Sequence, residues 1–480
     1  MPPLREPSSP TAAAPPPAAA IDAIRNLVGP KGVVEGDDTK PFLTEWRDRW
    51  SGQAALIVMP NSTDQVAQIV KICAAHKIAI TPQGGNTGLV GGQIPFSNEI
   101  LVSLKRMRNI RKISKFDNAL TVDAGVTLAE AQEEAAKHDR LFPLSIGSEG
   151  TCQIGGVIST NAGGVNVLRY GNMRDLVLGI EAVIPSGEIW NGLKVLRKDN
   201  TGYDLKQLFI GGEGTLGIVT GAVLKLFPQP KNKTTAVIGV PSPEMAVSLL
   251  SHTQEAVGGV ISSFELMSRR CIELVLKNIP GTRDPLIMSH PWYVLAEFSD
   301  SAKGDLTDEI EALLERMISD SIATDVIIAQ NQTQTAQLWH LRHSISEAMN
   351  GEGVGARHDV SVPTAQIPAF LKIADGAVEK IAPGARVVAF GHIGDGNIHY
   401  DVIPPEGNSK DALDDVRPLI EAGVYEAIDR FDGSISAEHG VGRHKKERVA
   451  SSKSQIELNM MGAVKSALDP DGIMNPGKML

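Results

Sequence analysis

The chain has 480 residues, of which 42% are hydrophobic and 21% are charged, and its formal net charge is −10. This length predicts two or three domains, and the negative charge argues against a nucleic-acid-binding protein while leaving room for a local basic pocket for a small anion. No apolar run approaches the roughly 20 residues of a transmembrane segment. The cysteines, Cys73, Cys152 and Cys271, lack metal or disulfide spacing, which fits a reducing compartment.

The first 20 residues, MPPLREPSSPTAAAPPPAAA, are rich in proline and alanine. Such a segment cannot pack a core, so we expect a disordered tail followed by an N-terminal helix. It lacks the basic start and the apolar block of a secretory signal. Arg5 is the single basic residue before Arg25, so the segment gives only weak support for an organelle presequence. We therefore predict a cytoplasmic protein.

Residues 54–82 have the pattern of a strand, a helix and a second strand. The segments AALIVMP (54–60) and IAITP (78–82) are apolar and rich in β-branched residues, as buried strands are. Between them, Ser62 and Gln65 have the spacing of a capping box, and apolar residues then recur at helical spacing. The order predicts an α/β unit.

Three glycine-rich stretches follow, at 83–95, 147–164 and 211–220. Glycine lets backbone N–H groups approach a ligand closely, so the first stretch, with five glycines, predicts a nest for a phosphate or pyrophosphate. A predicted strand at 98–104 comes next instead of a helix, which excludes a Rossmann site, and no G-K-[ST] motif of a P-loop occurs. One of these stretches alone could be a flexible surface loop, but a single ligand wrapped by several loops accounts better for all three. Between them, residues 176–189 predict a strand pair.

The stretch AFGHIGDGNIHYDV (389–402) has the composition of a β-hairpin. A two-residue turn centred on Asp395-Gly396 would place His392 opposite His399, and alternation would put Asp401 on the same face. Two imidazoles held about 5 Å apart at Cβ could share a metal ion. The alternative is an ordinary hairpin with two satisfied, partly buried histidines.

The other parts of the second half are less specific. Residues 232–335 mix predicted strands and helices, and 411–431 predicts an amphipathic helix. Residues 337–350 predict a helix in which Arg342 and Ser346, four residues apart, are neighbours on one side.

A family resemblance emerges from six segments taken together: PQGGNTGLVGG, IGGVISTNAGG, GGEGTLGIVT, GHIGDGNIH, SAEHGVG and NPGK. Over about residues 45–480 the chain resembles FAD-dependent D-2-hydroxyacid dehydrogenases of the vanillyl-alcohol oxidase type flavoprotein superfamily. The resemblance implies an α+β fold with a PCMH-type FAD-binding domain of two α/β subdomains. The implied organisation is a tail and N-terminal helix at 1–44, the FAD-binding domain at 45–230, an α+β substrate (cap) domain at 231–430 and a C-terminal segment at 431–480 that returns to the flavin.

In this family the first glycine stretch holds the pyrophosphate of FAD, and the later stretches lie along the flavin. Asn86 stands about where some relatives carry a histidine that tethers the flavin covalently, so we expect non-covalent FAD. The implied FAD-binding residues are Pro82, Gly84, Gly85, Asn86, Thr87, Gly88, Leu89, Gly91, Gly92, Ser148, Gly155, Gly156, Asn161, Gly163, Glu213, Gly214, Ile218 and Asn475.

The resemblance also implies that His392, His399 and Glu438 ligate a divalent metal and that His439 is the catalytic base. Two histidines and a carboxylate with an open position fit a catalytic zinc site, and manganese would accept the same ligands. Such a cation would lower the pKa of the substrate hydroxyl, so that a histidine can take its proton while hydride leaves C2 for flavin N5.

The residues implied at the substrate are Arg342, Ser346, Arg357 and Asp401. Relatives with a dicarboxylate substrate usually have asparagine where this chain has Asp401, and an ionised aspartate would repel a carboxylate. Either Asp401 pairs with Arg342 or Arg357, or it touches the metal, or the substrate is not 2-hydroxyglutarate.

The implied activity is oxidation of a D-2-hydroxy acid to the 2-oxo acid, with D-2-hydroxyglutarate as the first candidate and D-lactate or another monocarboxylate as the alternative. We expect an electron acceptor such as an electron-transfer flavoprotein or a quinone, and a homodimer. A metal-dependent hydrolase would leave the glycine stretches without a role, and a non-catalytic flavin-binding protein would not account for the full set of catalytic residues.

Overall fold

A computed structural model describes residues 15–301, 306–353 and 355–480. The chain forms two compact units. The glycine-loop unit comprises residues 15–163, Gly171–Gln229 and His439–Leu480, and the histidine unit comprises Gly164–Tyr170 and Pro230–Glu438. Most of the predicted Pro/Ala tail lies outside the described residues, and its last three alanines already belong to helix α1 (Ala18–Val28). The domain boundaries at 45, 231 and 431 stay a prediction.

The glycine-loop unit contains two main sheets. Four strands have the order β1-β2-β4-β3, in which β2, β4 and β3 run parallel. Five strands form an antiparallel sheet with the order β5-β6-β10-β8-β9. The bounds are β1 Val33–Val34, β2 Leu56–Val58, β3 Ile80–Gln83, β4 Ile100–Ser103, β5 Ile110–Ser114, β6 Ala119–Asp123, β8 Val177–Val183, β9 Ile189–Gly192 and β10 Ile218–Lys225.

The strands that were predicted in this unit from apolar segments rich in β-branched residues are confirmed. The predicted strands near residues 56, 80 and 100 are β2, β3 and β4, and the predicted strand pair is β8 with β9. The Ser62 side chain accepts a hydrogen bond from the Gln65 backbone N–H and caps α3 (Thr63–His76). The Gln65 side chain accepts from the Asn61 N–H instead of the Ser62 N–H, so the reciprocal half of the capping box is displaced by one residue.

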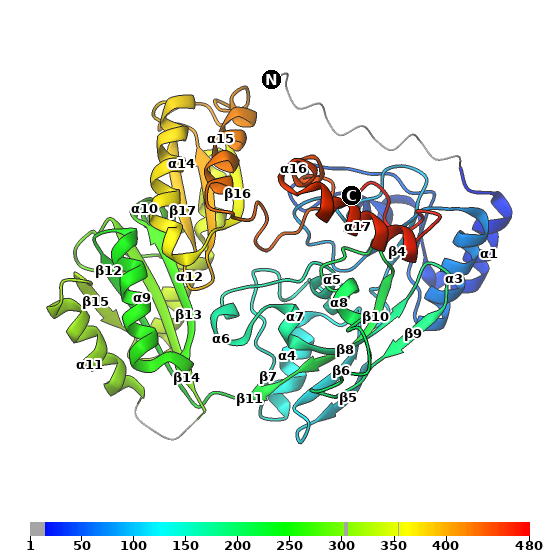
Figure 1. Ribbon diagram of the computed structural model, residues 1–480, viewed down its shortest axis with the longest axis horizontal. Coiled ribbons are helices and arrows are strands. Elements are labelled where there is room, and N and C mark those ends of the chain that lie inside the picture. The colour runs from blue at the N-terminus through cyan, green and yellow to red at the C-terminus, as the bar shows by residue number, and fades with distance from the viewer. Residues whose placement is uncertain (1–14, 302–305, 354) are drawn as a thin grey trace. The chain divides into compact units, whose positions relative to one another are not determined.

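One antiparallel sheet of seven strands organises the histidine unit. Its order is β15-β12-β14-β13-β17-β18-β16, and Figure 1 shows helices packed on it. The bounds are β12 Asn232–Val240, β13 Ile261–Ser268, β14 Trp292–Asp300, β15 Asp325–Ile328, β16 Ala356–Ser361, β17 Arg386–His392 and β18 Asn397–Ile403.

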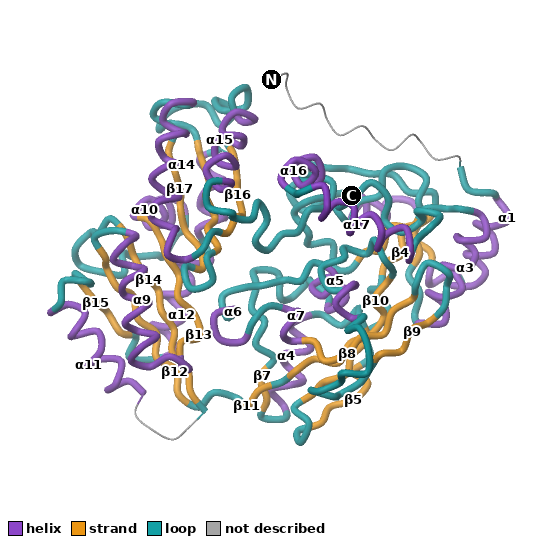
Figure 2. The backbone as a smooth tube through the Cα atoms, viewed as in Figure 1, coloured by secondary structure: helices purple, strands orange, loops and turns teal. Residues whose placement is uncertain are grey.

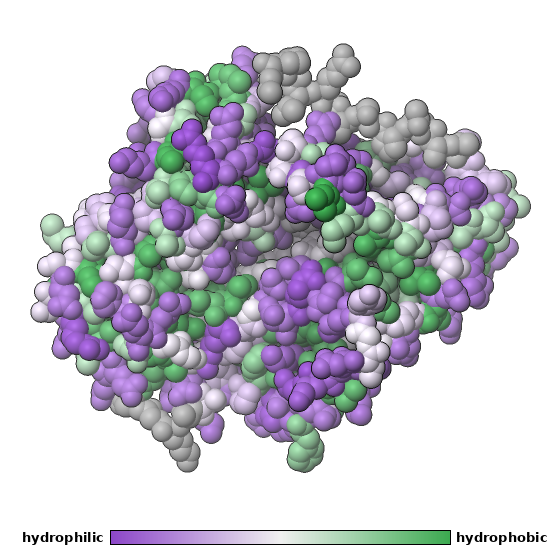
Figure 3. Space-filling model, in the orientation of Figure 1, coloured by the Kyte–Doolittle hydropathy of each residue, from purple (hydrophilic) through white to green (hydrophobic). Residues whose placement is uncertain are grey.

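Helices cover both faces of this sheet because successive strand residues point to opposite sides. One face packs with α9 (Pro243–Val257), α11 (Leu306–Ser319), α14 (Ile367–Ile381) and α15 (Arg417–Asp429) in the larger core. The other packs with α10 (Arg269–Asn278), α12 (Gln332–His343) and α13 (Ile345–Ala348). Figure 2 shows α9 and α14 in front of the strands, and Figure 3 shows a hydrophilic outer surface on α11, as expected for an amphipathic helix.

The predicted hairpin forms, but its register is wrong by two residues. His399 of β18 pairs with Phe390 of β17, not with His392, and residues 393–396 form a four-residue loop. The Asp395 carboxylate accepts a hydrogen bond from the Asn397 N–H, which stabilises this wider turn. Because side chains alternate with a period of two, the shift leaves both histidines on one face of the sheet.

Among the described residues, none of the helices is both long and apolar enough to cross a bilayer.

The packing of helices on the seven-stranded sheet can be tested by substitutions in the core of the histidine unit. Ile238 is completely buried in the larger core, whereas Ile287 is fully exposed. We expect Ile238→Ala to lower the free energy of unfolding by about 2–5 kcal/mol through lost burial and a residual cavity. Ile287→Ala, the matched control, should change it by less than about 0.5 kcal/mol. Urea unfolding followed by near-UV circular dichroism measures both, and equal effects would contradict the assigned core.

Candidate active site

The three glycine-rich stretches meet within the glycine-loop unit. A Cβ atom built on Gly85 would lie 2.0 Å from the Thr151 carbonyl oxygen, and one on Gly84 would lie 3.5 Å from the Gly156 Cα. Gly214 has a φ of +72°, and a Cβ there would lie 2.4 Å from Pro82 Cγ. Glycine is therefore required at 85, beside the second stretch, and at 214, beside Pro82, whereas the contact at Gly84 is an ordinary van der Waals distance.

The second stretch contains a short helix, α5 (Ile154–Ser159), that includes Gly155 and Gly156. A Cβ on Gly155 would lie 2.9 Å from Ala124 Cβ, so the helix packs closely on the unit. Asn161 has a φ of +50° and accepts a hydrogen bond from the Arg174 N–H. Ile218, at the start of β10, is buried in the core.

Glu213 and Asn475 tie these stretches to the C-terminal part of the chain. The Asn475 side-chain amide donates to the carbonyls of Gly92 and Glu213 at 2.9 and 2.8 Å. The Glu213 carboxylate accepts from the N–H groups of Val441 and Gly442 at 2.7 and 2.8 Å. Burial raises the pKa of the Glu213 carboxyl. Both side chains thus hold loops in place.

Buried polar atoms beside the first two stretches mark where a polar ligand fits. Gln83 Oε1, Asn86 Oδ1 and Gln153 Oε1 are buried without a hydrogen-bond partner in the part of the chain that is described. The Asn86 amide donates to the carbonyls of Pro41 and Thr44, and an amide cannot form the covalent tether of a histidine. Unpaired buried acceptors and close backbone approach fit a cofactor with donor groups and phosphates, such as FAD.

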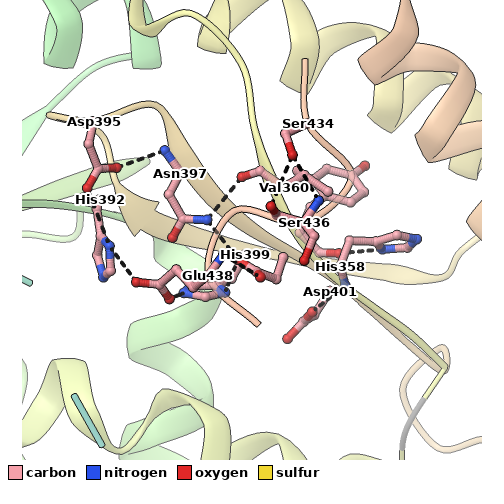
Figure 4. A network of polar contacts seen from close by, with 12 residues as sticks. His358, Val360, His392, Asp395, Asn397, His399, Asp401, Ser434, Ser436 and Glu438 are labelled. Carbon is pink, nitrogen blue, oxygen red and sulfur yellow. Dashed lines mark hydrogen bonds and ion pairs between the residues drawn. The ribbon is translucent and has the colours of Figure 1, made fainter. Parts of the chain in front are cut away.

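In the histidine unit, His392, His399 and Glu438 converge. One ligand atom from each lies within 4.8 Å of those of the other two. The Glu438 carboxylate lies between the imidazoles, with Oε1 3.4 Å from His392 Nδ1 and Oε2 3.8 Å from His399 Nε2 (Figure 4). The ring centroids are 5.9 Å apart. Two imidazoles and a carboxylate are the donor set of catalytic zinc sites.

Two further carboxylates stand behind the imidazoles. Glu265 Oε2 lies 3.8 Å from His392 Nε2, and Asp359 Oδ1 lies 4.0 Å from His399 Nδ1. Asp359 also accepts hydrogen bonds from the Asn397 side-chain amide and from the Glu438 N–H, at 2.9 and 3.0 Å. Asp359 therefore fixes the backbone of Glu438 relative to β18.

The electrostatics of this cluster favour a cation. Burial and the charges of Asp359, Asp395 and Glu265 raise the pKa of Glu438 well above its ordinary value. Burial raises the pKa of Asp395 to about 7. Burial, with the charge of Arg342, lowers the pKa of His392 to about 3, so this imidazole stays neutral, as a metal ligand must be. Its Nδ1 is buried and lacks a hydrogen bond from any described residue.

The residues predicted at the substrate are only partly brought together. Arg342 on α12 is 8% exposed, and its Nε and Nη2 each lie 2.7 Å from Glu265 Oε2. Ser346 is exposed, and the single helix predicted over 337–350 is divided at Ser344 into α12 and α13. That Arg342 and Ser346 are neighbours on one side stays a prediction.

Arg357 and Asp401 are directly opposite each other on β16 and β18. Asp401 accepts a hydrogen bond from the His358 N–H at 3.2 Å, and Arg357 donates to Asn350 Oδ1 at 3.0 Å. Opposite positions in the strand register do not by themselves make an ion pair, so the three alternatives for Asp401 stay open. His439 follows Glu438 directly, is half-buried and begins the last segment of the glycine-loop unit.

Glu265 and Asp359 are site residues that the sequence motifs did not reveal. Each is the one acidic residue of its strand, β13 or β16, and alternation would have placed it on a covered face of a sheet. An acidic residue at a covered position of a strand therefore indicates a paired carboxylate. The sequence pattern does not identify the residues that pair with it.

The chain matches a family model for the FAD binding domain over residues 54–192 and one for the C-terminal domain of FAD linked oxidases over residues 229–479. The chain belongs to the FAD-linked oxidase family. It is therefore an FAD-dependent oxidoreductase, and the family recognised from the sequence is confirmed.

Relatives of this FAD-linked oxidase are similar over most of their length. A D-2-hydroxyglutarate dehydrogenase of Stutzerimonas stutzeri is 36% identical, with 96% of this chain and 98% of the relative covered. A mitochondrial D-2-hydroxyglutarate dehydrogenase of Arabidopsis thaliana is also 36% identical, with 96% and 81% covered. A D-2-hydroxyglutarate–pyruvate transhydrogenase of Saccharomyces cerevisiae is 37% identical, with 92% and 90% covered.

Solved structures support the fold. An alkyldihydroxyacetonephosphate synthase superposes with a TM-score of 0.73 at 18% identity, covering 96% of this chain and 87% of that one. A p-cresol methylhydroxylase gives a TM-score of 0.71 at 17% identity, covering 96% of each chain. The predicted α+β class with a PCMH-type FAD-binding domain is confirmed.

The prediction of a cytoplasmic location is wrong. The relatives from Arabidopsis thaliana, Danio rerio and Bos taurus are named mitochondrial. Free, scattered cysteines distinguish reducing from oxidising surroundings but do not distinguish the cytoplasm from a reducing organelle interior. Residues 1–14, on whose low basic content the prediction also rested, lie outside the described part of the chain.

Asn475 gives a test of the FAD cradle. In Asn475→Asp, a carboxylate of the same shape would face two carbonyl oxygens that now accept hydrogen bonds, so we expect FAD affinity to fall about 10–100-fold. Titration of the apoprotein with FAD, followed by flavin fluorescence, measures this. Asn459→Asp, on the exposed face of α17 (Gln455–Leu468), is the control and should bind FAD as the parent does. Equal affinity in both variants would contradict the role given to Asn475.

Proposed function

We propose that this chain oxidises a D-2-hydroxy acid to the 2-oxo acid with metal assistance, with D-2-hydroxyglutarate as the first candidate substrate and D-lactate or another D-2-hydroxy monocarboxylate as the alternative. The observation that carries the proposal is the group of His392, His399 and Glu438, with ligand atoms within 4.8 Å of one another, in a chain of an FAD-dependent family. The relatives named D-2-hydroxyglutarate dehydrogenase support the first substrate, and a Schizosaccharomyces pombe relative named a putative D-lactate dehydrogenase supports the second.

The donor set is the reason for proposing a metal. A buried, neutral imidazole with an unpaired Nδ1 and a half-buried carboxylate beside it fit a divalent cation, for which we propose zinc, with manganese as the alternative. When bound, the cation supplies Lewis acidity that lowers the pKa of a hydroxyl on it. When bound, FAD supplies the two-electron acceptor.

The residues of the chain then have distinct tasks. His439, next to Glu438, takes the proton of the C2 hydroxyl, because an imidazole of ordinary pKa near 6.5 is a competent base at neutral pH. Arg342 and Arg357 bind carboxylate oxygens of the substrate, as planar guanidinium groups do well. Asp401 opposite Arg357 offsets part of that positive charge. An electron-transfer flavoprotein or a quinone is the proposed acceptor, and a homodimer is the proposed assembly.

Anaerobic reduction of the bound flavin tests the reaction. D-2-Hydroxyglutarate should bleach the visible flavin absorbance of the holoenzyme, while the L enantiomer, which presents C2 with the opposite hand, should not. A panel of D-2-hydroxy acids with one and two carboxylates, compared by reduction rate, identifies the substrate class. If no D-2-hydroxy acid reduces the flavin of protein that holds both FAD and metal, the proposal is wrong.

His439 is tested by a variant that keeps the cofactor. His439→Ala should lower the rate of flavin reduction by about 10²–10⁴-fold, since it removes the general base, while FAD content stays unchanged. His252→Ala, at an exposed position on α9, is the matched control and should leave the rate unaltered. Stopped-flow absorbance measures both. Reduction by His439→Ala at the parent rate would exclude this residue from proton transfer.

A further inference from the structure

Glu265 is a fully buried carboxylate that the proposed reaction does not use. It lies on β13, is 0% exposed, and is the cross-strand partner of His392 on β17. A carboxylate at such a site is costly unless it is paired. Its partners therefore indicate why it is there.

The orientation of the His392 ring distinguishes its two nitrogens. Nδ1 lies 3.4 Å from Glu438 Oε1 and lacks a hydrogen bond among the described residues, so it faces the proposed metal site. Nε2 lies 3.8 Å from Glu265 Oε2 on the other side of the ring. A neutral imidazole carries one N–H, so Nδ1 can donate its lone pair to a metal only when the proton is on Nε2. The Glu265 carboxylate, 3.8 Å from Nε2, would then be the acidic group beside that N–H.

The same carboxylate oxygen holds Arg342. Glu265 Oε2 lies 2.7 Å from both Nε and Nη2 of Arg342, and the guanidinium carbon lies 4.8 Å from the centre of the Phe390 ring. Side-chain positions of the arginine and the imidazole are thus coupled through one oxygen atom. A carboxylate behind a metal-binding histidine fixes its tautomer and raises its basicity.

We propose that Glu265 is a positioning residue that keeps the His392 proton on Nε2, so that Nδ1 binds the metal, and that it fixes Arg342 beside the same site. The inference rests on the metal site of the proposed function. It predicts that losing the negative charge at position 265 weakens metal binding even though Glu265 itself is not a ligand.

The test is Zn²⁺ affinity, measured on the metal-depleted, FAD-containing protein by competition with a chromophoric chelator. Glu265→Gln keeps the shape of the side chain but removes the charge, and we expect Zn²⁺ to bind about 10–100-fold more weakly. The control is Glu297→Gln, because Glu297 is a buried carboxylate of the same sheet, on β14, that bonds to Trp339 and Ser262. The control should keep the parent affinity.

A second variant guards against a folding defect. Glu265→Gln leaves Arg342 buried without its counter-ion, which is destabilising. The double variant Glu265→Met with Arg342→Met removes both charges and leaves no unpaired one, and it should still bind Zn²⁺ more weakly than the parent, with FAD content and circular dichroism unchanged.

The outcomes separate this inference from the function it rests on. If the parent protein binds Zn²⁺ and both position-265 variants bind it equally tightly, Glu265 has no role toward the metal, while the proposed function stands. If the parent protein binds no divalent metal at the His392 site, the metal-assisted function and this inference both fail.

Discussion

The structure of the candidate site depends on an excess of negative charge around two imidazoles, with Glu265 and Asp359 buried and Glu438 half-buried. In addition to burial, the charges of Glu265 and Asp359 raise the pKa of both Asp395 and Glu438, and Arg342 acts in the opposite direction on Glu438. Such a cluster is stable only if some of its carboxyl groups are protonated or a cation balances their charge. The two imidazole nitrogens beside the Glu438 carboxylate make a divalent cation the chemically matched counter-charge, which connects the electrostatics of the fold to its proposed chemistry.

The seven-stranded sheet is what makes this cluster possible. Four neighbouring strands, from β13 at the centre of the sheet through β17 and β18 to β16 at its edge, each contribute a polar residue to one face. The opposite face packs against α9, α11, α14 and α15. The antiparallel register aligns Glu265 with His392 and Asp359 with His399. Glu438 then joins the group from the segment after α15, where its N–H is fixed by Asp359. The helices thus stabilise a surface on which the site is built, and local strand pairing sets its geometry.

The sequence predicts the features that are determined by residues close together along the chain. Strands, glycine stretches and the shared face of His392 and His399 follow from composition and alternation. The shared face is correct although the predicted register was not, because a shift of two residues leaves each side chain on the same face. The turn was wrong because the Asp395 carboxylate bonds to the backbone two residues on, a local bond that competes with the two-residue turn. The helix break at Ser344 and the carboxylates behind the histidines depend on tertiary packing of distant segments, so periodicity alone could not show them. Most FAD-binding and substrate residues came from the family resemblance, not from physical pattern.

X-ray absorption at the metal K edge of the purified, FAD-containing protein tests the central claim most directly. Our account predicts one tightly held divalent metal with two imidazole nitrogens and carboxylate oxygen in its coordination shell, and the imidazole signal should decrease when either His392 or His399 is replaced by alanine. A protein free of bound metal after purification and metal reconstitution, or a metal whose spectrum is unchanged by both substitutions, would contradict it.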